Sequence, residues 1–461
     1  MTTIHIRNLE IVTLDDAGTI LHDADLVVQD GRIAYVGEAP PDLRADEVVD
    51  GSGRVAMPGF VNAHCHSPMT FERGWAEDLP FDRWLNEKIW VAESALTPDD
   101  VYWGAALAAC EMIRSGTVAF NDHYFYMDRV AEVVRESGLK AALTWCVFGI
   151  GPEAEVGPGL EGTVEWIKET HGTADGRIRT FLGPHSPYIC PPDFLSRIVE
   201  LAHELGQGIH LHLSEDSEQV TQSLERHGMR PVQFVDSLGL FDVPGGVVAA
   251  HGLALNEPDR DILAEKGVHV AHCPITYMKL AMVFPPLRPR LAAGVRVCLG
   301  TDGPGSNNDM DMFAVMRQTA LNEKYLMLDP EALPGDTPLR MATQNGARAL
   351  GFEGMGALVP GAPADLILVN LDAPHMRPIH SLIANLVFCG EGRRRDRRDG
   401  RWPLADAQPR TANARRGADS VRGGAPRAGD GQARHAPDAG VSGVRAGESN
   451  SPAKWDSQAI L

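Results

Sequence analysis

The sequence predicts an α/β fold: a (β/α)8 TIM barrel of residues 56–355, with a small β-sandwich domain built from both chain ends, 1–55 and 356–390. Two observations predict this fold. Eight short apolar runs alternate with helix-length segments, as in repeated βα units with a parallel sheet. Nearly every run also ends in a titratable side chain, and the carboxyl ends of barrel strands converge on one mouth, where the chemistry of such barrels takes place.

The elements follow one another in a regular order. Residues 1–55 contain short alternating runs separated by Asp-Gly and Gly turns, which predicts an all-β segment. Acidic starts and glycine ends mark 98–116, 128–138 and 193–206 as helices. Residues 356–372 return to a β pattern and should pair with the N-terminal strands. We expect the barrel strands at 55–64, 117–123, 141–149, 178–185, 208–215, 247–251, 268–274 and 296–302.

The pattern breaks at about residue 391. Residues 391–461 are rich in Arg, Gly, Ala and Pro and contain almost no large apolar side chains. Such a segment cannot bury enough surface to offset its chain entropy, so we expect an aberrant, disordered tail. A reading-frame shift in a GC-rich gene is one hypothesis for its origin. Translation of the parent DNA in the other two frames tests this hypothesis, which fails if neither frame encodes a further strand and a closing helix.

Charge and cysteine usage limit the partners and the compartment. The first 390 residues carry 28 Lys/Arg against 53 Asp/Glu, which argues against nucleic acid and favours a small heterocyclic substrate. Seven scattered cysteines without a C-x-x-C pair indicate reduced thiols. No signal peptide and no apolar run of about 18 residues is visible. We therefore expect a cytoplasmic protein without a membrane segment, and a homo-oligomer is compatible with the sequence.

Four residues at predicted strand ends carry the side chains of a metal site. His64 and His66 form an H-x-H pair whose imidazoles share one side of an extended strand. His212 ends the fifth run and Asp302 the eighth, although an Asp-Gly pair is often only a turn. Each motif alone is weak. Their common position predicts one divalent ion, with Zn²⁺ as first choice and Fe²⁺ as second, because three imidazoles and a carboxylate suit these ions better than Mg²⁺ or Ca²⁺.

Further residues at the predicted mouth are candidates for proton transfer. Glu215 follows His212 by three residues, but an exposed loop glutamate would be an equally ordinary interpretation. His251 ends the sixth run and could hydrogen-bond the attacking water or a developing oxyanion, or be a packed histidine. We predict that Glu215, His251 and Asp302 are catalytic. Weaker candidates of the same kind are His185 and His272. His210, two residues before His212, could share the inward face or be a packed histidine, and we do not predict it as a ligand.

Large side chains near the first predicted strand end could form the wall of a substrate pocket. Apolar and aromatic residues there could line a site for a flat ring, and helix core is an equally good interpretation. These residues are Met69, Phe71, Trp75, Trp84 and Trp90.

The first 390 residues resemble the amidohydrolase superfamily, in the branch of the triazine hydrolases and adenosine-type deaminases. Within that branch they resemble most the methylthioadenosine/S-adenosylhomocysteine deaminases. The resemblance lies in residues 58–85, in HLSE (212–215), in AAHG (249–252), in LGTDGPGSNNDMDMF (299–313) and in 356–372. It implies a mononuclear metal barrel with a flanking β-sandwich. It further implies the metal ligands His64, His66, His212 and Asp302, the proton shuttle Glu215 with His251 assisting, and substrate contacts at His185 and at the ribose-binding Glu93.

Some positions depart from the deaminase pattern. Trp145 stands where these deaminases carry an Arg for the distal part of the substrate, and a second Arg has no counterpart in 151–162. The loop 276–280 reads T-Y-M-K-L in place of S-N-L-K-L. These changes indicate a smaller or more apolar substituent on the ring or the ribose. We expect Trp84 and Trp145 to bind the substrate together with Glu93 and His185.

The predicted function is metal-dependent hydrolytic deamination of an aminated N-heterocycle. The first candidate is an adenosine-type nucleoside, such as 5′-methylthioadenosine or adenosine, with release of ammonia. The alternatives are triazine dechlorination or aminohydrolysis, and deamination of a guanine-like base. Amide hydrolysis by a binuclear site is disfavoured because Gly183-Pro184-His185 provides no bridging Lys at the fourth strand end. A non-catalytic scaffold is disfavoured by the complete set of candidate site residues.

Overall fold

The computed structural model describes residues 2–150 and 157–392, and its larger sheet has eight parallel strands. These strands follow one another in chain order, from β6 to β13. The sheet nearly closes into a barrel, because the Asp302 amide after β13 donates a hydrogen bond to the His64 carbonyl of β6 at 3.0 Å. The barrel strands are β6 Phe60–Cys65, β7 Thr117–Tyr124, β8 Lys140–Val147, β9 Ile178–Pro184, β10 Gly208–Leu213, β11 Val247–His251, β12 His269–His272 and β13 Arg296–Leu299.

The predicted (β/α)8 fold is confirmed, with one change at the first strand. The run 55–64 is two strands: β5, Arg54–Pro58, belongs to the smaller sheet, and only β6 enters the barrel. The chain changes sheet at Gly59, where a Cβ would collide with the side chain of Val118. A continuous apolar run does not reveal this change, because both strands are buried.

The smaller sheet is mixed and combines strands from both ends of the described chain. Its order is β14-β5-β1-β2-β3, with β4 paired to β1. β14, Leu366–Asn370, runs antiparallel to β5, as the β pattern of 356–372 predicts. The remaining strands are β1 Thr3–Val12, β2 Ile20–Gln29, β3 Arg32–Gly37 and β4 Glu47–Asp50. The division into domains at 55/56 and 355/356 stays a prediction. The predicted tail, 391–461, falls outside the described residues from 393 onward.

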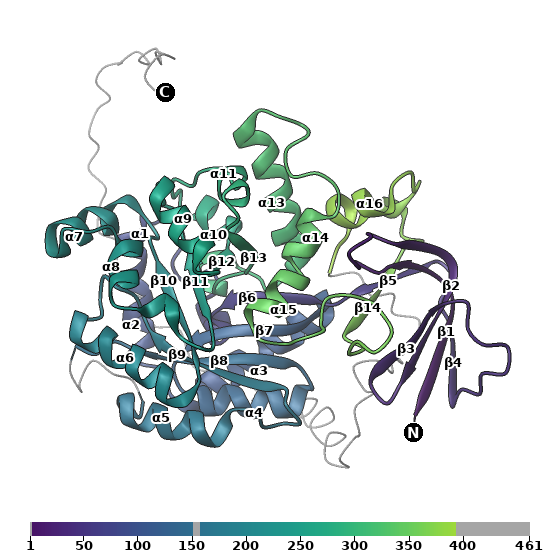
Figure 1. Cartoon of the computed structure of the whole chain (residues 1–461), viewed down its shortest axis with the longest axis horizontal. Coiled ribbons are helices and arrows are strands. Elements are labelled where there is room, and N and C mark those ends of the chain that lie inside the picture. Colours follow the sequence, from purple (N-terminus) through teal and green to yellow (C-terminus); the bar gives the residue numbers. More distant parts are fainter. Residues whose placement is uncertain (1, 151–156, 393–461) are drawn as a thin grey trace, which may run out of the picture. The chain divides into compact units, whose positions relative to one another are not determined.

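Helices follow the barrel strands and surround the barrel (Figure 1). The segment between 81 and 93 has a π-helical middle, a feature often found near functional sites. Among the described residues, no helix is both long and apolar enough to cross a membrane. The helices are η1 Ser67–Glu72, α1 Phe81–Trp84, η2 Leu85–Ile89, α2 Trp90–Glu93, α3 Pro98–Ser115, α4 Met127–Ser137, α5 Gly159–Thr170, α6 Pro192–Leu205, α7 Ser217–His227, α8 Pro231–Ser237, η4 Leu240–Asp242, α9 Glu257–Glu265, α10 Pro274–Lys279, α11 Arg288–Ala292, α12 Pro304–Asn307, α13 Met312–Met327, α14 Thr337–Met341, α15 Gln344–Ala349, η5 Pro374–Met376 and α16 Leu382–Cys389.

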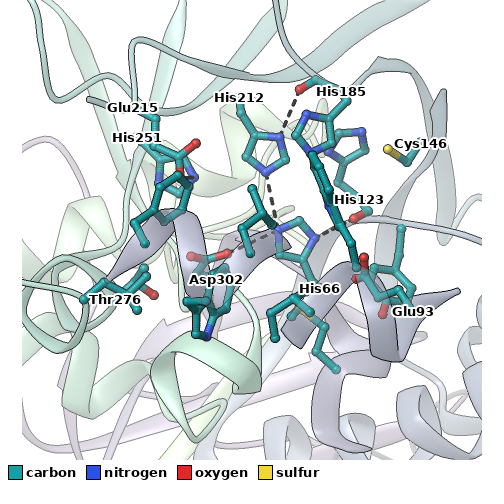
Figure 2. A pocket seen from close by; sticks show the side chains of 18 of the residues that line it. His66, Glu93, His123, Cys146, His185, His212, Glu215, His251, Thr276 and Asp302 are labelled. Atoms are coloured by element: carbon teal, nitrogen blue, oxygen red, sulfur yellow. Dashed lines mark hydrogen bonds and ion pairs between the residues drawn. The ribbon is translucent and has the colours of Figure 1, made fainter. Parts of the chain in front are cut away.

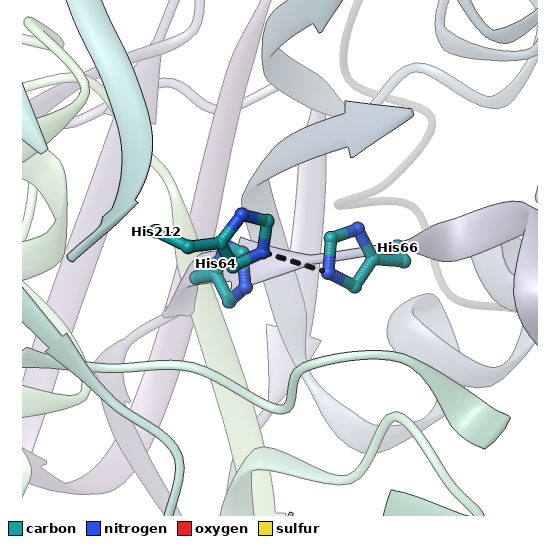
Figure 3. Close-up of side chains that lie close together, drawn as sticks. All are labelled: His64, His66 and His212. Atoms are coloured by element: carbon teal, nitrogen blue, oxygen red, sulfur yellow. Dashed lines mark hydrogen bonds between the residues drawn. The ribbon is translucent and has the colours of Figure 1, made fainter. Parts of the chain in front are cut away.

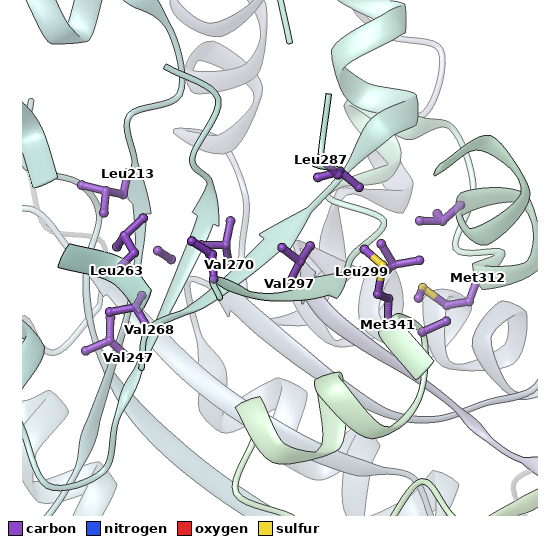
Figure 4. Packing of buried hydrophobic residues seen from close by; sticks show 14 of the residues in the cluster. Leu213, Val247, Leu263, Val268, Val270, Leu287, Val297, Leu299, Met312 and Met341 are labelled. Carbon is purple, nitrogen blue, oxygen red and sulfur yellow. The ribbon is translucent and has the colours of Figure 1, made fainter. Parts of the chain in front are cut away.

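The core lies on both sides of the barrel wall. Outward-facing Val270 and Val297 belong to a buried cluster that includes Leu263 of α9, Met312 of α13 and Met341 of α14 (Figure 4). A separate buried cluster of mostly small side chains includes Val61, Ala63, Ala119, Ala142, Val248, Ala271 and Cys298 of the strands together with Ala347 of α15. The carboxyl ends of the barrel strands carry polar side chains instead, among them His64, His212 and His251.

Helix α3 supports the segment that follows the first metal-site histidines. A capping box between Thr97 and Asp100 starts this helix, and Gly116, with φ +92°, ends it. At Gly104, an added Cβ would lie 3.0 Å from the Cα of Pro68 in η1 and closer still to its carbonyl oxygen. The glycine therefore permits close packing of α3 on η1.

Gly104→Ala is expected to destabilise the protein by about 1–3 kcal/mol, because backbone atoms cannot move aside as a flexible side chain can. Urea unfolding followed by circular dichroism measures this change. Leu107→Ala, on the exposed face of the same helix, is the matched control and should cost clearly less. Equal losses for the two variants would contradict this account of the packing.

Candidate metal centre and active site

Three histidines and one aspartate meet at the carboxyl end of the barrel, and Figure 2 shows His66, His212 and Asp302 of this set. His64 lies on β6, His66 just beyond it, His212 on β10 and Asp302 three residues beyond β13. The Nε2 atoms of His66 and His64 lie 3.2 and 3.5 Å from Asp302 Oδ1. The Nε2 atoms of His212 and His66 lie 3.4 Å apart (Figure 3). The ligand atoms of the three histidines lie within 4.8 Å of one another and could hold one metal ion.

Hydrogen bonds on the far side of each ring orient these histidines. His66 Nδ1 lies 2.6 Å from the carbonyl oxygen of His123, and His212 Nδ1 lies 3.0 Å from that of His185. A carbonyl only accepts, so we assign the proton of each neutral ring to Nδ1, which leaves Nε2 as a lone pair. His64 Nδ1 contacts His210 Nε2 at 3.0 Å, so His210 supports a ring of the cluster.

The cluster fits a bound cation. His64 Nε2 is buried without a hydrogen-bond partner, and two Nε2 lone pairs face each other in His66 and His212. Burial lowers the pKa of His66, but Asp302 outweighs this effect and raises it to about 9, so without an ion the Nε2 atom would hold a proton, which a metal ion would replace. The site therefore stabilises positive charge. Three imidazoles with one carboxylate form a donor set suited to zinc or iron.

The backbone around the cluster is strained at three positions. Ser214, His251 and Asp302 are non-glycine residues with φ of +50°, +75° and +63°. Left-handed backbone in such residues is uncommon and concentrates at functional sites. The Ser306 hydroxyl donates a hydrogen bond to Asp302 Oδ2 at 3.1 Å and so helps to hold the Asp302 side chain in place.

Glu215 and His251 lie beside the cluster as a buried pair. Glu215 Oε1 is 3.5 Å from His251 Nε2, and the Gln219 amide donates to Glu215 Oε2 at 3.3 Å. Burial, followed by the charge of Asp302, raises the pKa of Glu215 to about 8. Burial lowers the pKa of His251 to about 3, so this ring is neutral at pH 7. Glu215 is thus poised to exchange a proton near neutral pH.

The pocket above the cluster has aromatic and apolar walls. Trp84, Glu93 and His185, each predicted to contact the substrate, line it. His185 also stacks on Phe148 with ring centroids 5.3 Å apart. Met69 and Trp90 also line the pocket, whereas Phe71 and Trp75 are exposed at the surface.

The predicted substrate contact of Trp145 stays a prediction, and the described pocket lining does not include this residue. Neighbouring residues Thr144 and Cys146 point into the barrel, where Thr144 contacts His210 and Cys146 lines the pocket. Side chains alternate along a strand, so Trp145 points outward and packs on Trp166 of α5 at 5.3 Å. His272 is also buried outside the pocket lining.

Several residues at the site are not among the sequence predictions. Gln219 and Ser306 hydrogen-bond Glu215 and Asp302, and each lies in the helix that follows the predicted residue, four positions further along. Tyr124, Phe148 and Tyr188 lie at or beyond strand ends without a pattern that distinguishes them from core aromatics.

Comparison with known proteins places this arrangement in a family. Residues 55–396 match the amidohydrolase family. The chain belongs to the amidohydrolase family. A 5-methylthioadenosine/S-adenosylhomocysteine deaminase of Moorella thermoacetica is 46% identical over 396 residues, which is 85% of this chain and 91% of the relative.

Solved structures agree with this family assignment. A zinc-bound adenosine deaminase from Xanthomonas campestris is similar with a TM-score of 0.80 and 32% identity, over 91% of this amidohydrolase and 99% of that chain. A zinc-complexed atrazine chlorohydrolase from Arthrobacter aurescens has a TM-score of 0.75 and 25% identity, over 83% and 91% of the two chains. Both are similar across the barrel that carries the cluster.

Proposed function

We propose that this amidohydrolase is a metal-dependent hydrolytic deaminase of an adenosine-type nucleoside, such as 5′-methylthioadenosine or adenosine, and that it releases ammonia. The observation that carries the proposal is the Glu215–His251 pair beside three converging histidines and Asp302. The relatives that are deaminases support the same reaction.

His64, His66, His212 and Asp302 would hold one divalent ion, Zn²⁺ before Fe²⁺. Such an ion polarises water so that it becomes a nucleophile at neutral pH. Zinc is favoured by the donor set and by the zinc-bound structural relatives.

Glu215 and His251 handle the protons of this reaction. Glu215 accepts a proton from the attacking water and delivers it to the ring nitrogen, and then assists the departure of ammonia. Its raised pKa, about 8, suits a group that both accepts and donates near pH 7. The neutral His251 and the anionic Asp302 orient the water and stabilise developing charge.

The pocket favours a substrate without a negatively charged substituent. Its described lining contains the carboxyl groups of Glu93, Glu215 and Asp302 but no Lys or Arg. A substrate carboxylate would lack a basic side chain to pair with there and would lie near these carboxyl groups. The aromatic walls suit a purine ring, and Glu93, which lines the same pocket, would accept hydrogen bonds from sugar hydroxyls. S-adenosylhomocysteine is therefore expected to be a poorer substrate than the neutral nucleosides.

Ammonia release from a panel of substrates tests the proposal. We expect kcat/KM for 5′-methylthioadenosine and adenosine to exceed that for S-adenosylhomocysteine at least about tenfold, the effect of one unpaired charge worth roughly 1.4 kcal/mol. Guanine, cytosine and triazines serve as comparison substrates. If guanine or a triazine is turned over faster than the nucleosides, that compound is the better candidate for the substrate. If S-adenosylhomocysteine is turned over as fast as 5′-methylthioadenosine, the charge argument is refuted.

A further inference from the structure

The Glu215–His251 pair depends on strained backbone. Ser214, directly before Glu215, and His251 itself are left-handed, with φ of +50° and +75°. The two side chains of the pair lie close together, with Glu215 Oε1 3.5 Å from His251 Nε2 (Figure 2). Left-handed backbone in non-glycine residues persists only where the surrounding structure fixes it. The loop 252–255, which follows His251, connects the two strained positions.

The amide groups of this loop bind it to the end of β10. The Gly252 amide donates a hydrogen bond to the Leu213 carbonyl at 3.0 Å. The next two amides along the chain donate to the Ser214 carbonyl at 2.8 and 3.0 Å. Because Leu213 and Ser214 directly precede Glu215, the loop joins the end of β11 to the backbone that carries this acid.

Three arginines bind the carbonyl groups of the same loop. Arg290 of α11 donates from Nη2 to the Leu253 carbonyl at 3.4 Å. Arg230, directly before α8, donates from Nη2 to the Ala254 carbonyl at 2.5 Å. Arg260 of α9 donates to the following carbonyl at 3.4 Å. Three consecutive carbonyls are thus bound by side chains from three different segments.

Arg230 and Arg290 are placed in this set at a cost. Arg290 is only 2% exposed, and its Nη1 atom has no hydrogen-bond partner in the described part of the chain. The Arg230 side chain is 20% exposed and also binds the fully buried carboxylate of Asp259, with Nε 2.6 Å from Oδ2. Burial of a guanidinium is unfavourable unless strong hydrogen bonds offset it. Two such groups on one loop indicate that the position of this loop matters.

We propose that Arg230 and Arg290 are positioning residues that fix the loop 252–255 and thereby keep His251 in contact with Glu215. The inference rests on the proposed function, because it concerns the pair that would move the protons. Neither arginine belongs to the described pocket lining, so neither touches the substrate. When one of them is removed, the loop carbonyls lose a charged donor, the strained backbone at His251 relaxes, and the distance between the two side chains of the pair increases.

Arg290→Met tests this role, because it removes the guanidinium and keeps an unbranched side chain. The residues proposed to bind the substrate, Trp84, Glu93 and His185, lie in other segments, so the loss should fall on kcat. For 5′-methylthioadenosine we expect kcat to fall about 10- to 100-fold, with KM and bound zinc within about threefold, since a displacement of about 1 Å can cost about 10²-fold in rate.

Arg177→Met is the matched control. Arg177 is 7% exposed and donates to the carbonyls of Val134 and Leu139 at 2.6 and 2.8 Å. It directly precedes β9, at the amino end of the barrel and away from the pocket lining. Its substitution should lower Tm, as Arg290→Met does, but leave kcat within about twofold, because a distant site acts independently of the pair.

Hydrogen exchange of the intact enzymes follows the loop directly. The amides of 252–254 should exchange about tenfold faster in Arg290→Met and at the wild-type rate in Arg177→Met. Equal losses of kcat in the two variants, or a folded Arg290→Met protein with wild-type kcat, would overturn the inference. A rise in KM without a fall in kcat would overturn it as well.

A second variant serves if Arg290→Met does not fold. Arg230→Lys keeps a positive charge beside Asp259, but an ammonium group lacks the fork that reaches the Ala254 carbonyl as well. The same fall in kcat and the same faster exchange are expected. If the wild type releases no ammonia from any nucleoside, the proposed function fails, and the exchange of the loop amides still decides whether the arginines fix the loop.

Discussion

Glu215→Gln is expected to lower kcat by about 10²- to 10⁴-fold while the protein keeps its metal and its fold. The amide has the size of the carboxyl group and can still contact Gln219, but it cannot accept a proton from water and return it to the ring nitrogen. Ammonia release under saturating substrate measures the loss, and elemental analysis of the same samples measures bound zinc.

Glu218→Gln is the matched control for this variant. Glu218 lies in α7, three residues further along, and its side chain is exposed and away from the pocket lining. Its substitution should leave kcat within about twofold, as for most surface changes. A Glu215→Gln protein that retains full metal and turns over within tenfold of wild type would refute the proton-transfer role.

Removal of the metal should abolish ammonia release and destabilise the protein. The four proposed ligands lie on or just beyond β6, β10 and β13, far apart in the sequence, and one ion would hold them together. A ligand present at 1,000 times its dissociation constant stabilises the folded state by about 4.1 kcal/mol, and this contribution disappears with the ion. Treatment with a strong chelator is therefore expected to lower Tm by several degrees, and added Zn²⁺ should restore both Tm and turnover.

Asp302→Asn tests the same site without a chelator. The amide keeps the shape but removes the anionic ligand, so bound zinc should fall well below the one equivalent expected for the wild type. Asp261→Asn, at an exposed position of α9, is the control and should retain full metal. A verified metal-free protein with wild-type turnover, or no bound metal in the active wild type, would exclude the metal-dependent mechanism and restore the scaffold interpretation.

The order of the strands could be predicted because each barrel strand is a short apolar run with its own signal. The same runs carried His212, His251 and Asp302 at or near their ends, which is why candidate site residues could be proposed before the structure was known. Local patterns suffice here because parallel strands that succeed one another in a barrel bring their carboxyl ends to one face.

The face on which a side chain lies was predicted less well. Trp145 was predicted to bind the substrate, which stays a prediction, but the alternation of β8 directs its indole towards Trp166, a contact that the sequence did not reveal. A strand that is buried on both faces has no polar side to set the phase of this alternation. For the same reason the run 55–64 hides the change of sheet at Gly59.

The sequence by itself determined the fold class, the succession of the eight barrel strands and the residue types at their ends. Only the tertiary structure decided which of these residues converge: His210 supports His64, and His272 lies outside the pocket lining. The physical reason is that hydrophobic periodicity is a local property of the chain. The contacts that set a tautomer, a pKa or a proton position join residues far apart in the sequence, and they exist only once the barrel has formed.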